Sequence, residues 1–210
     1  MSKILAIVPA RGGSKRIPGK NKQKLAGKEL VRYAIEAALA SSKITQVVLS
    51  SDDADILAIG KSYDQLISLE RPAEISGDLA PAITYVQDTL SRLPTEYDYV
   101  VIIQPSSPFT QSEDIDATLD LLVNSTADSA VSVMKLDHAI QPAKLKTLAE
   151  DGVLHPYMEE EAGRMAAHEL PELYVRNGSV YSATNASIQQ GNIIGPTCLA
   201  YEMSRERSVD

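Results

Sequence analysis

Glycines and basic side chains alternate in a short stretch that follows the first apolar run of the chain. Positions 9–21 read PARGGSKRIPGKN, with Gly12, Gly13 and Gly19 set among lysines and arginines. Glycine lets backbone N–H groups come close to an oxyanion, and basic side chains neutralise the charge of phosphate groups. The stretch therefore predicts a site for a small polyanion, and we call residues 9–21 the phosphate loop. The alternative is a solvated basic surface, the common meaning of a lysine-rich run.

The spacing within the phosphate loop excludes two well-known nucleotide motifs. Five residues separate Gly13 from Gly19, whereas a Walker loop has four, and Asn21 stands where that loop carries its metal-binding hydroxyl. The glycine pattern GxGxxG does not occur in the loop either. A P-loop NTPase and a dinucleotide dehydrogenase are thus both disfavoured.

Charge is distributed unevenly along the sequence. The chain has 210 residues and a formal net charge of −8, yet residues 1–28 contain no acidic side chain. A general nucleic-acid binder needs a broad basic face to neutralise phosphates, so the overall charge argues against nucleic acid as a partner. One positive island on an acidic protein fits a small anionic ligand better.

Apolar runs and helical periodicities alternate on both sides of this loop. We predict strands at 3–8, 46–49, 66–69, 99–103 and 129–134, and helices at 30–38, 54–63, 83–90 and 115–123. This alternation predicts an α/β fold with a doubly wound, mostly parallel, Rossmann-like sheet. In such sheets ligands bind beyond the carboxyl ends of the strands. The phosphate loop directly follows the first strand, so it is expected at that edge.

The regular alternation stops between about 138 and 171. Prolines and the run Glu159-Glu160-Glu161, which we interpret as a solvated face, replace it, and strand-like segments return at 173–181 and 198–203. We therefore expect one domain over 1–210 with an insertion at about 138–171. Cys198 is the only cysteine, and a small buried thiol in the core is the expected environment for it.

Two features of the sequence bear on the compartment. A single cysteine provides no disulfide framework, and the apolar run near the amino terminus, Ile4 to Val8, is too short for a signal-peptide core or a membrane span. We expect a cytoplasmic protein that does not associate with membranes. His138, His155 and His168 show no metal-ligand spacing, and we expect them at the surface or at an interface.

Several motifs together resemble one enzyme family. The string ARGGSKRIPGKN is similar to the signature of the cytidylyltransferases that activate acidic sugars, the CMP-N-acylneuraminate and CMP-Kdo synthetases. Further similar motifs follow in the same order: SSDD at 50–53, RPAE at 71–74, QPSSP at 104–108 and RNGSVY at 176–181. QPSSP and RNG resemble the acylneuraminate branch more than the Kdo branch. The resemblance covers nearly the whole chain and implies a nucleotide-diphospho-sugar transferase type of fold.

The resemblance implies a CTP site and an in-line transfer of CMP with release of pyrophosphate. Its positions for the triphosphate and ribose are Arg11, Gly12, Gly13, Ser14, Lys15, Lys20 and Asn21. Its positions on the cytosine side are Arg71, Asp78, Ala80 and Ala82. Arg11 and Lys20 are the expected catalytic groups, because such a reaction is accelerated mainly by orientation and by neutralising phosphate charge.

The resemblance also implies a site for an acidic nonulosonic sugar. The matching positions are Gln104, Ser106, Arg164, Tyr174, Arg176 and Asn177. A guanidinium suits the sugar carboxylate because it binds carboxylates in a bidentate fork. Members of the family use the inserted region to embrace a second subunit, so we expect a homodimer in which an inserted residue lines the sugar pocket of the partner.

Magnesium is the cofactor that the resemblance implies. The family holds it with an Asp-x-Asp pair late in the chain, and Ser208-Val209-Asp210 matches the beginning of that pair. The sequence ends at Asp210, before the second aspartate and the closing helix of the family. We therefore expect Asp210 to be a catalytic metal ligand in a sequence that is shortened relative to the family, or in a protein that completes its metal site differently.

Some of these residues have simpler structural interpretations. Arg71 could be a surface arginine before a turn proline, and Gln104 could tie the end of a strand to a neighbouring loop. For Asp52 and Asp53 we expect a role in capping the next helix rather than in binding metal, since aspartate accepts hydrogen bonds from free N–H groups at a helix start.

Three competing functions remain at this point. The same chemistry could act on a pseudaminic, legionaminic or Kdo-type acid. A nucleotide-binding protein without catalysis would bind CTP and release no pyrophosphate. An enzyme that uses UTP, GTP or ATP would need a larger or differently bonded base pocket.

Overall fold

A mixed sheet of seven strands organises the part of the chain that the structure describes. The computed structural model describes residues 2–158 and 171–209. The strand order is β11-β7-β10-β6-β1-β4-β5. The strands are β1 Ile4–Pro9, β4 Gln46–Ser51, β5 Leu66–Glu70, β6 Tyr99–Ile103, β7 Ser129–Lys135, β10 Tyr174–Thr184 and β11 Cys198–Glu202. β10 runs antiparallel to β6 and β7, and the other pairs are parallel. The mostly parallel α/β sheet expected from the sequence is confirmed.

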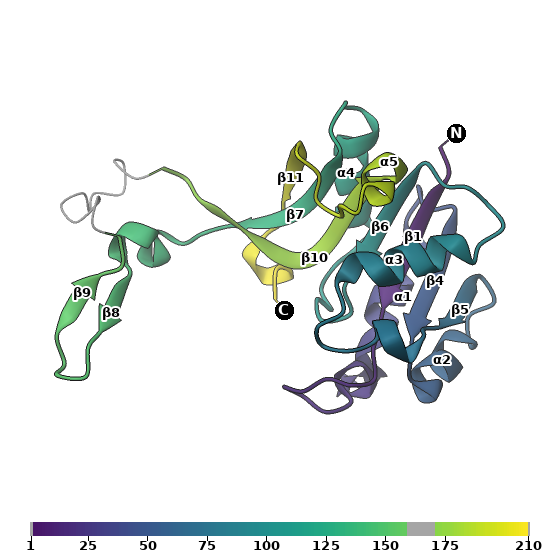
Figure 1. Ribbon diagram of the computed structural model, residues 1–210, viewed down its shortest axis with the longest axis horizontal. Coiled ribbons are helices and arrows are strands. Elements are labelled where there is room, and N and C mark those ends of the chain that lie inside the picture. Colours follow the sequence, from purple (N-terminus) through teal and green to yellow (C-terminus); the bar gives the residue numbers. More distant parts are fainter. Residues whose placement is uncertain (1, 159–170, 210) are drawn as a thin grey trace.

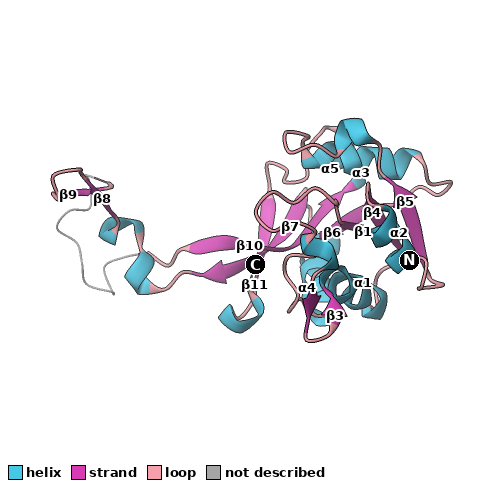
Figure 2. Cartoon of the chain, turned by 90° about the horizontal axis from the view of Figure 1, so that it is seen from below, coloured by secondary structure: helices cyan, strands magenta, loops and turns pink. Residues whose placement is uncertain are grey.

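Helices cover both faces of this sheet. α1 (Leu30–Ala40), α2 (Ala54–Gly60) and α4 (Ser112–Val123) pack on one face, and α3 (Ala82–Ser91) and α5 (Asn185–Gln189) pack on the other. Figure 2 shows α3 and α5 on the side opposite α1 and α4. The chain moves from β1 through β4 to the edge strand β5 and then crosses to β6 on the other side of β1. This reversal places a topological switch point at the carboxyl end of β1.

The core forms because the central strands are apolar on both faces. Ile4 to Val8 of β1 are all buried, as expected of a parallel strand between two helical layers. In α1 the buried residues Val31, Ala34, Ile35 and Ala38 follow helical spacing and pack against β1 and β4. Each fully buried Val, Leu or Ile stabilises the fold by about 1.5–3 kcal/mol relative to exposure.

Two aspartates that follow β4 have different roles. Asp53 caps α2, because its Oδ1 accepts hydrogen bonds from the backbone N–H groups of Asp55 at 2.9 Å and Ile56 at 3.1 Å. The capping role expected for Asp53 is therefore correct. The same expectation was wrong for Asp52, whose Oδ1 accepts a hydrogen bond from the backbone N–H of Gly12 at 2.8 Å. Its carboxylate anchors the phosphate loop instead of the helix.

A long arm projects from the body of the molecule (Figure 1). β7 and β10 leave the sheet together, and the hairpin of β8 (Lys146–Leu148) and β9 (Leu154–Pro156) lies near the far end. We call the described residues 136–158 and 171–176 the arm. It coincides with the segment at 138–171 where the sequence loses its regular alternation, and residues 159–170, including Glu159-Glu160-Glu161 and His168, lie outside the described residues.

Cys198 departs from expectation. It is exposed, because β11 forms an edge of the sheet and carries alternating side chains that face solvent. The expected core thiol was therefore wrong. Among the described residues, no helix has the length and apolarity that a membrane span requires.

Candidate functional site

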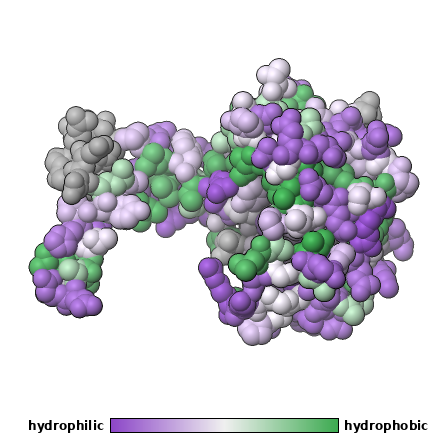
Figure 3. All heavy atoms as spheres, viewed as in Figure 1, coloured by the Kyte–Doolittle hydropathy of each residue, from purple (hydrophilic) through white to green (hydrophobic). Residues whose placement is uncertain are grey.

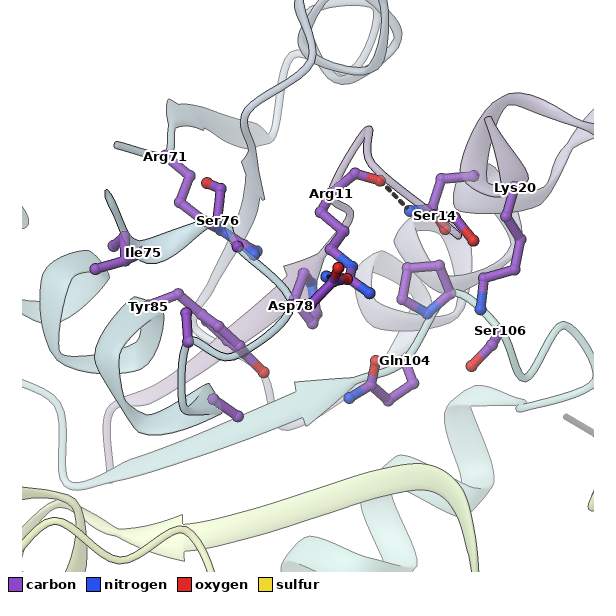
Figure 4. A pocket seen from close by; sticks show the side chains of 16 residues that line it. Arg11, Ser14, Lys20, Arg71, Ile75, Ser76, Asp78, Tyr85, Gln104 and Ser106 are labelled. Carbon is purple, nitrogen blue, oxygen red and sulfur yellow. Dashed lines mark hydrogen bonds and ion pairs between the residues drawn. The ribbon is translucent and has the colours of Figure 1, made fainter. Parts of the chain in front are cut away.

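A cavity of about 260 Å³ opens at the carboxyl ends of β1, β5 and β6. Figure 4 shows Arg71 and Tyr85 at one end of it, Lys20 and Ser106 at the other, and Arg11 with Asp78 between them. The lining residues are Pro9, Arg11, Ser14, Lys20, Asn21, Arg71, Ile75, Ser76, Gly77, Asp78, Ala80, Ala82, Tyr85, Gln104, Pro105 and Ser106. The fold thus brings together the start of the phosphate loop, the turn after β5 and the turn after β6.

The phosphate loop is held by contacts with the residues after β4 and by a contact within the loop itself. The carboxylate of Asp52 accepts from Gly12 N–H, and a Cβ at Gly12 would lie 2.8 Å from Asp53 Oδ2, so no larger residue fits there without a shift. At the other end, Gly19 has a φ of 62°, a conformation that favours glycine. Asn21 is buried, and its Nδ2 donates to the carbonyl oxygen of Arg11 at 2.9 Å. These contacts fix the course of the loop before any ligand binds.

Cations of the phosphate loop meet an acid from the turn after β5. Asp78 pairs with Arg11 Nη1 at 2.7 Å and with Lys15 Nζ at 2.5 Å. The hydrogen bonds from Lys15 and Arg11 lower the pKa of Asp78 below its ordinary value. Asp78 therefore shares a single negative charge between these two cations and neutralises them only in part.

A second, wider cavity of about 750 Å³ continues from the first along the phosphate loop. Arg11, Ser14, Lys20, Asp78 and Ser106 line both cavities. The second cavity adds the basic side chains of Lys15, Arg16 and Lys24 to the shared Arg11 and Lys20. A chain of phosphate groups would find neutralising charge along this line.

Arg71 lies at one end of the first cavity, beside Tyr85 (Figure 4). Its side chain is 6% exposed, so the alternative of a surface arginine before a turn proline is wrong. Burial lowers the pKa of Arg71, and the largest effect in the opposite direction is the interaction with the nearby Tyr85, which raises this pKa. Gly77 and Asp78 line the cavity nearby, together with Ala80 and Ala82, which the sequence placed near the base.

The residues expected at the sugar fall into two groups. Gln104 and Ser106 line the first cavity, and the Gln104 backbone N–H donates to Ser179 O at 3.1 Å. Tyr174 and Arg176 are exposed on the arm and line neither cavity. A single chain therefore does not bring these two to the cavity.

Asn177 is 7% exposed and serves a different set of contacts. Its Oδ1 accepts from Ser132 Oγ at 2.7 Å, and its Nδ2 donates to Ser208 Oγ at 2.9 Å. It thereby ties the C-terminal segment to β7. Arg164, the remaining candidate, lies outside the described residues.

The family follows from the sequence taken as a whole. Residues 5–198 match the family described as Cytidylyltransferase. The chain belongs to the cytidylyltransferases. The family suggested by the five motifs is confirmed.

Relatives of this cytidylyltransferase include three enzymes named for different acidic sugars. A CMP-N,N'-diacetyllegionaminic acid synthase of Legionella pneumophila is 33% identical over 190 residues, covering 89% of this chain and 80% of that protein. An N-acylneuraminate cytidylyltransferase of Escherichia coli O18:K1:H7 is 30% identical over 210 residues, all of this chain and 49% of that protein. A pseudaminic acid cytidylyltransferase of Campylobacter jejuni is 28% identical over 212 residues, 99% of this chain and 90% of that protein.

A solved structure shares the fold of this cytidylyltransferase. A CMP:2-keto-3-deoxy-manno-octonic acid synthetase complexed with CTP superposes with a TM-score of 0.71 over 97% of this chain and 90% of that one, at 16% identity. The mostly parallel α/β sheet expected from the sequence is thus the fold of that synthetase as well.

A magnesium site is not complete within the described part of the cytidylyltransferase. In residues 2–158 and 171–209 no group of three or more His, Cys, Asp or Glu side chains could hold a metal ion. Asp210, the expected ligand, lies outside the described residues. The carboxylate of Asp78 is already paired with two cations, and that of Asp52 anchors the phosphate loop. These residues do not fit a metal by themselves, so the metal site stays a prediction.

Tyr85 is a lining residue of the cytidylyltransferase cavity that the sequence did not single out. It lies on the buried face of α3, where its spacing with Val86 and Thr89 indicates only helix packing. The signal that could have found it is its position four residues after the Pro81 at the helix start. That position places it one turn inside a helix that begins at the cavity wall.

Proposed function

We propose that this cytidylyltransferase transfers CMP from CTP to the anomeric hydroxyl of an N-acylneuraminate with release of pyrophosphate. The observation that carries the proposal is a single cavity lined both by cations of the phosphate loop and by the buried Arg71. A triphosphate suits the cations of the loop and a compact pyrimidine suits the end beside Arg71. The relative named N-acylneuraminate cytidylyltransferase, which matches over the whole chain, supports this substrate pair.

The proposed reaction is a direct displacement at the α-phosphorus of CTP. The sugar hydroxyl loses its proton to solvent, and its oxygen forms a bond to that phosphorus. The bond from phosphorus to the bridging oxygen of pyrophosphate breaks at the same time, so the leaving group carries away the electron pair. Lys20 and Arg11 lie in both cavities and neutralise the charge that grows on the leaving oxygens. Gln104 and Ser106 orient the sugar from the turn after β6. Most of the acceleration then comes from orientation and fixed charge.

Magnesium belongs to the proposal as a cofactor. When bound, it would neutralise phosphate charge, with oxygens of the triphosphate and the carboxylate of Asp210 as ligands. The protein itself supplies cations beside the phosphates, among them Lys20, which lines both cavities.

A homodimer is the proposed assembly. The arm exposes apolar side chains and has no core of its own among the described residues: Leu148 is 71% exposed, Leu154 63% and Tyr157 65%. Figure 3 shows apolar surface along the arm and at its far end. A second copy that covers this surface would remove it from water. The same contact would bring Tyr174 and Arg176 toward the sugar of the partner subunit, since they line neither cavity of their own chain.

The identity of the sugar is the most specific part of the proposal. The relative named for N,N'-diacetyllegionaminic acid is 33% identical, which makes that acid the second candidate. Cytoplasmic residence also remains a proposal, supported by a single cysteine.

Pyrophosphate release by the purified chain with CTP and Mg²⁺ tests the function. Parallel reactions contain N-acetylneuraminic, legionaminic, pseudaminic or Kdo acid, and each is repeated with UTP. We expect release with CTP and N-acetylneuraminic acid and little with UTP. Pyrophosphate release with only one of the other acids would change the proposed sugar and leave the proposed reaction unchanged. CTP binding without pyrophosphate release in the presence of any of these acids would support a non-catalytic nucleotide binder and overturn the proposal.

A further inference from the structure

The guanidinium of Arg71 is held on one side by a single residue of the neighbouring strand. Arg71 Nε donates to Ser50 Oγ at 3.1 Å, and Nη2 donates to the Ser50 carbonyl oxygen at 2.9 Å. The Arg71 backbone N–H donates to Ser51 O at 2.7 Å, which continues the pairing of β4 with β5. The position and the plane of the guanidinium are therefore set by the end of β4.

An aromatic ring holds the other side. Arg71 Cζ lies 4.5 Å from the centroid of the Tyr85 ring, within the range of a cation–π contact. Tyr85 is 7% exposed, and its hydroxyl forms no hydrogen bond within the described residues. The ring makes the cation–π contact with Arg71, and the hydroxyl forms no hydrogen bond with it. Figure 4 shows both side chains at the same end of the cavity.

Arg71 differs from the other cations of the cavity. Arg11 pairs with Asp78, whereas Arg71 forms no ion pair with any described residue. Nε and Nη2 are engaged by Ser50, and Nη1 has no acceptor within the described part of the chain. Because Arg71 lines the cavity, a nitrogen that has no acceptor in the protein is available to an acceptor of a ligand bound there. The free nitrogen of a buried guanidinium suits a neutral acceptor in a small ligand.

We propose that Ser50 and Tyr85 are positioning residues for base selection, which fix Arg71 so that Nη1 donates to the adjacent acceptors O2 and N3 of cytosine. The inference rests on the proposed function, in which Arg71 lies beside the base. Uracil carries a hydrogen on N3, so a fixed donor there faces another donor. A guanidinium free to swing could turn away from that hydrogen, and the discrimination between CTP and UTP would weaken. Selection therefore depends on the ring and on Ser50 as well as on Arg71.

Calorimetric titration with CTP and with UTP tests the inference in a set of matched variants. Tyr85→Phe keeps the ring, and we expect its CTP preference to stay within about twofold of the wild type. Tyr85→Leu removes the ring, and we expect the CTP:UTP preference to fall by about tenfold, the size of one charge-assisted hydrogen bond. Tyr97→Leu is the control, because Tyr97 is 6% exposed in the same apolar cluster and does not line the cavity.

A second variant, Ser50→Ala, tests the inference even if Tyr85→Leu does not fold. Ser50→Ala removes the Oγ acceptor and keeps the backbone acceptor, so we expect a smaller loss of preference in a folded protein. Thermal unfolding of all variants shows which of them retain the fold.

Three results would overturn the inference. The first is an equal loss of CTP preference in Tyr85→Phe and Tyr85→Leu. The second is a full CTP preference in a folded Tyr85→Leu variant, and the third is a wild type that binds CTP and UTP equally well. A wild type that prefers CTP yet releases no pyrophosphate with any sugar would instead overturn the proposed function.

Discussion

The carboxylate of Asp78 lies 2.7 Å from Arg11 Nη1 and joins the turn after β5 to the phosphate loop. Lys15 completes the contact at 2.5 Å from the other carboxylate oxygen. Asp78 thus occupies the neighbourhood of the cations that a triphosphate needs. The Asp78 carboxylate therefore binds the same cations that we expect the phosphate groups of CTP to bind.

Asp78→Asn is expected to raise the affinity for CTP by about three- to tenfold. The variant removes a negative charge that repels the triphosphate and competes for Arg11 and Lys15, and partly exposed pairs have interaction energies of about 1 kcal/mol or less. Calorimetric titration at two salt concentrations measures the change, with Asp64→Asn as a control at an exposed acid. A lower affinity in Asp78→Asn would show that the side chain contacts the nucleotide directly.

Lys20→Ala is expected to lower kcat by about 100-fold or more, since a cation beside the leaving group stabilises the transition state more than the ground state. Initial rates of pyrophosphate release give kcat and KM separately. Lys61→Ala, at an exposed lysine after α2, is the control. Unchanged kcat with a raised KM would assign Lys20 to substrate binding alone.

Leu154→Asp is expected to convert the proposed dimer to a monomer. It places a charge on apolar surface at the tip of the arm, where Leu154 is 63% exposed in a single chain. Sedimentation velocity measures the change. Leu121→Asp, at a partly exposed apolar residue of α4, should leave the assembly unchanged. A wild type that sediments as a monomer would contradict the proposed assembly.

Asp53→Asn is expected to reduce the free energy of unfolding by about 1 kcal/mol at pH 7. Burial alone would raise the pKa of Asp53, but the hydrogen bonds from Lys22 and from the backbone N–H groups of Ile56 and Asp55 outweigh it and lower the pKa below 3.8. A depressed carboxyl pKa stabilises the fold above about pH 3.8, and this contribution is lost as the pH falls through the folded-state value. Urea unfolding at pH 7 and pH 3 should show a gap between wild type and variant that narrows at pH 3. A constant gap would mean that the charge of Asp53 is not the cause.

The order of strands and helices could be predicted because each central element carries its own periodicity. β1 is apolar throughout, and α1 repeats its buried residues at helical spacing. The short helix α5 was missed, since five residues give too little periodicity to recognise. Cys198 was misplaced because its exposure depends on β11 being an edge strand, a property of the sheet order that no local pattern contains.

The candidate site was predictable where backbone geometry requires particular residues. Gly12 and Gly19 mark the phosphate loop because a Cβ or an ordinary φ would not fit there. The contacts of Asp52 with Gly12 and of Tyr85 with Arg71 link residues far apart in the sequence. Such contacts follow from which strands become neighbours, and a motif read along the chain does not reveal them.

The arm has a simple topological meaning. Lys135 of β7 and Tyr174 of β10 are register partners in adjacent antiparallel strands, so everything between them is one enlarged hairpin connection. The entropy of closing a loop grows only slowly with its length. The connection can therefore lengthen or shorten without reordering the sheet that holds the cavity. The part of the molecule that reaches outward can change between descendants of the fold while the catalytic edge of the sheet keeps its architecture.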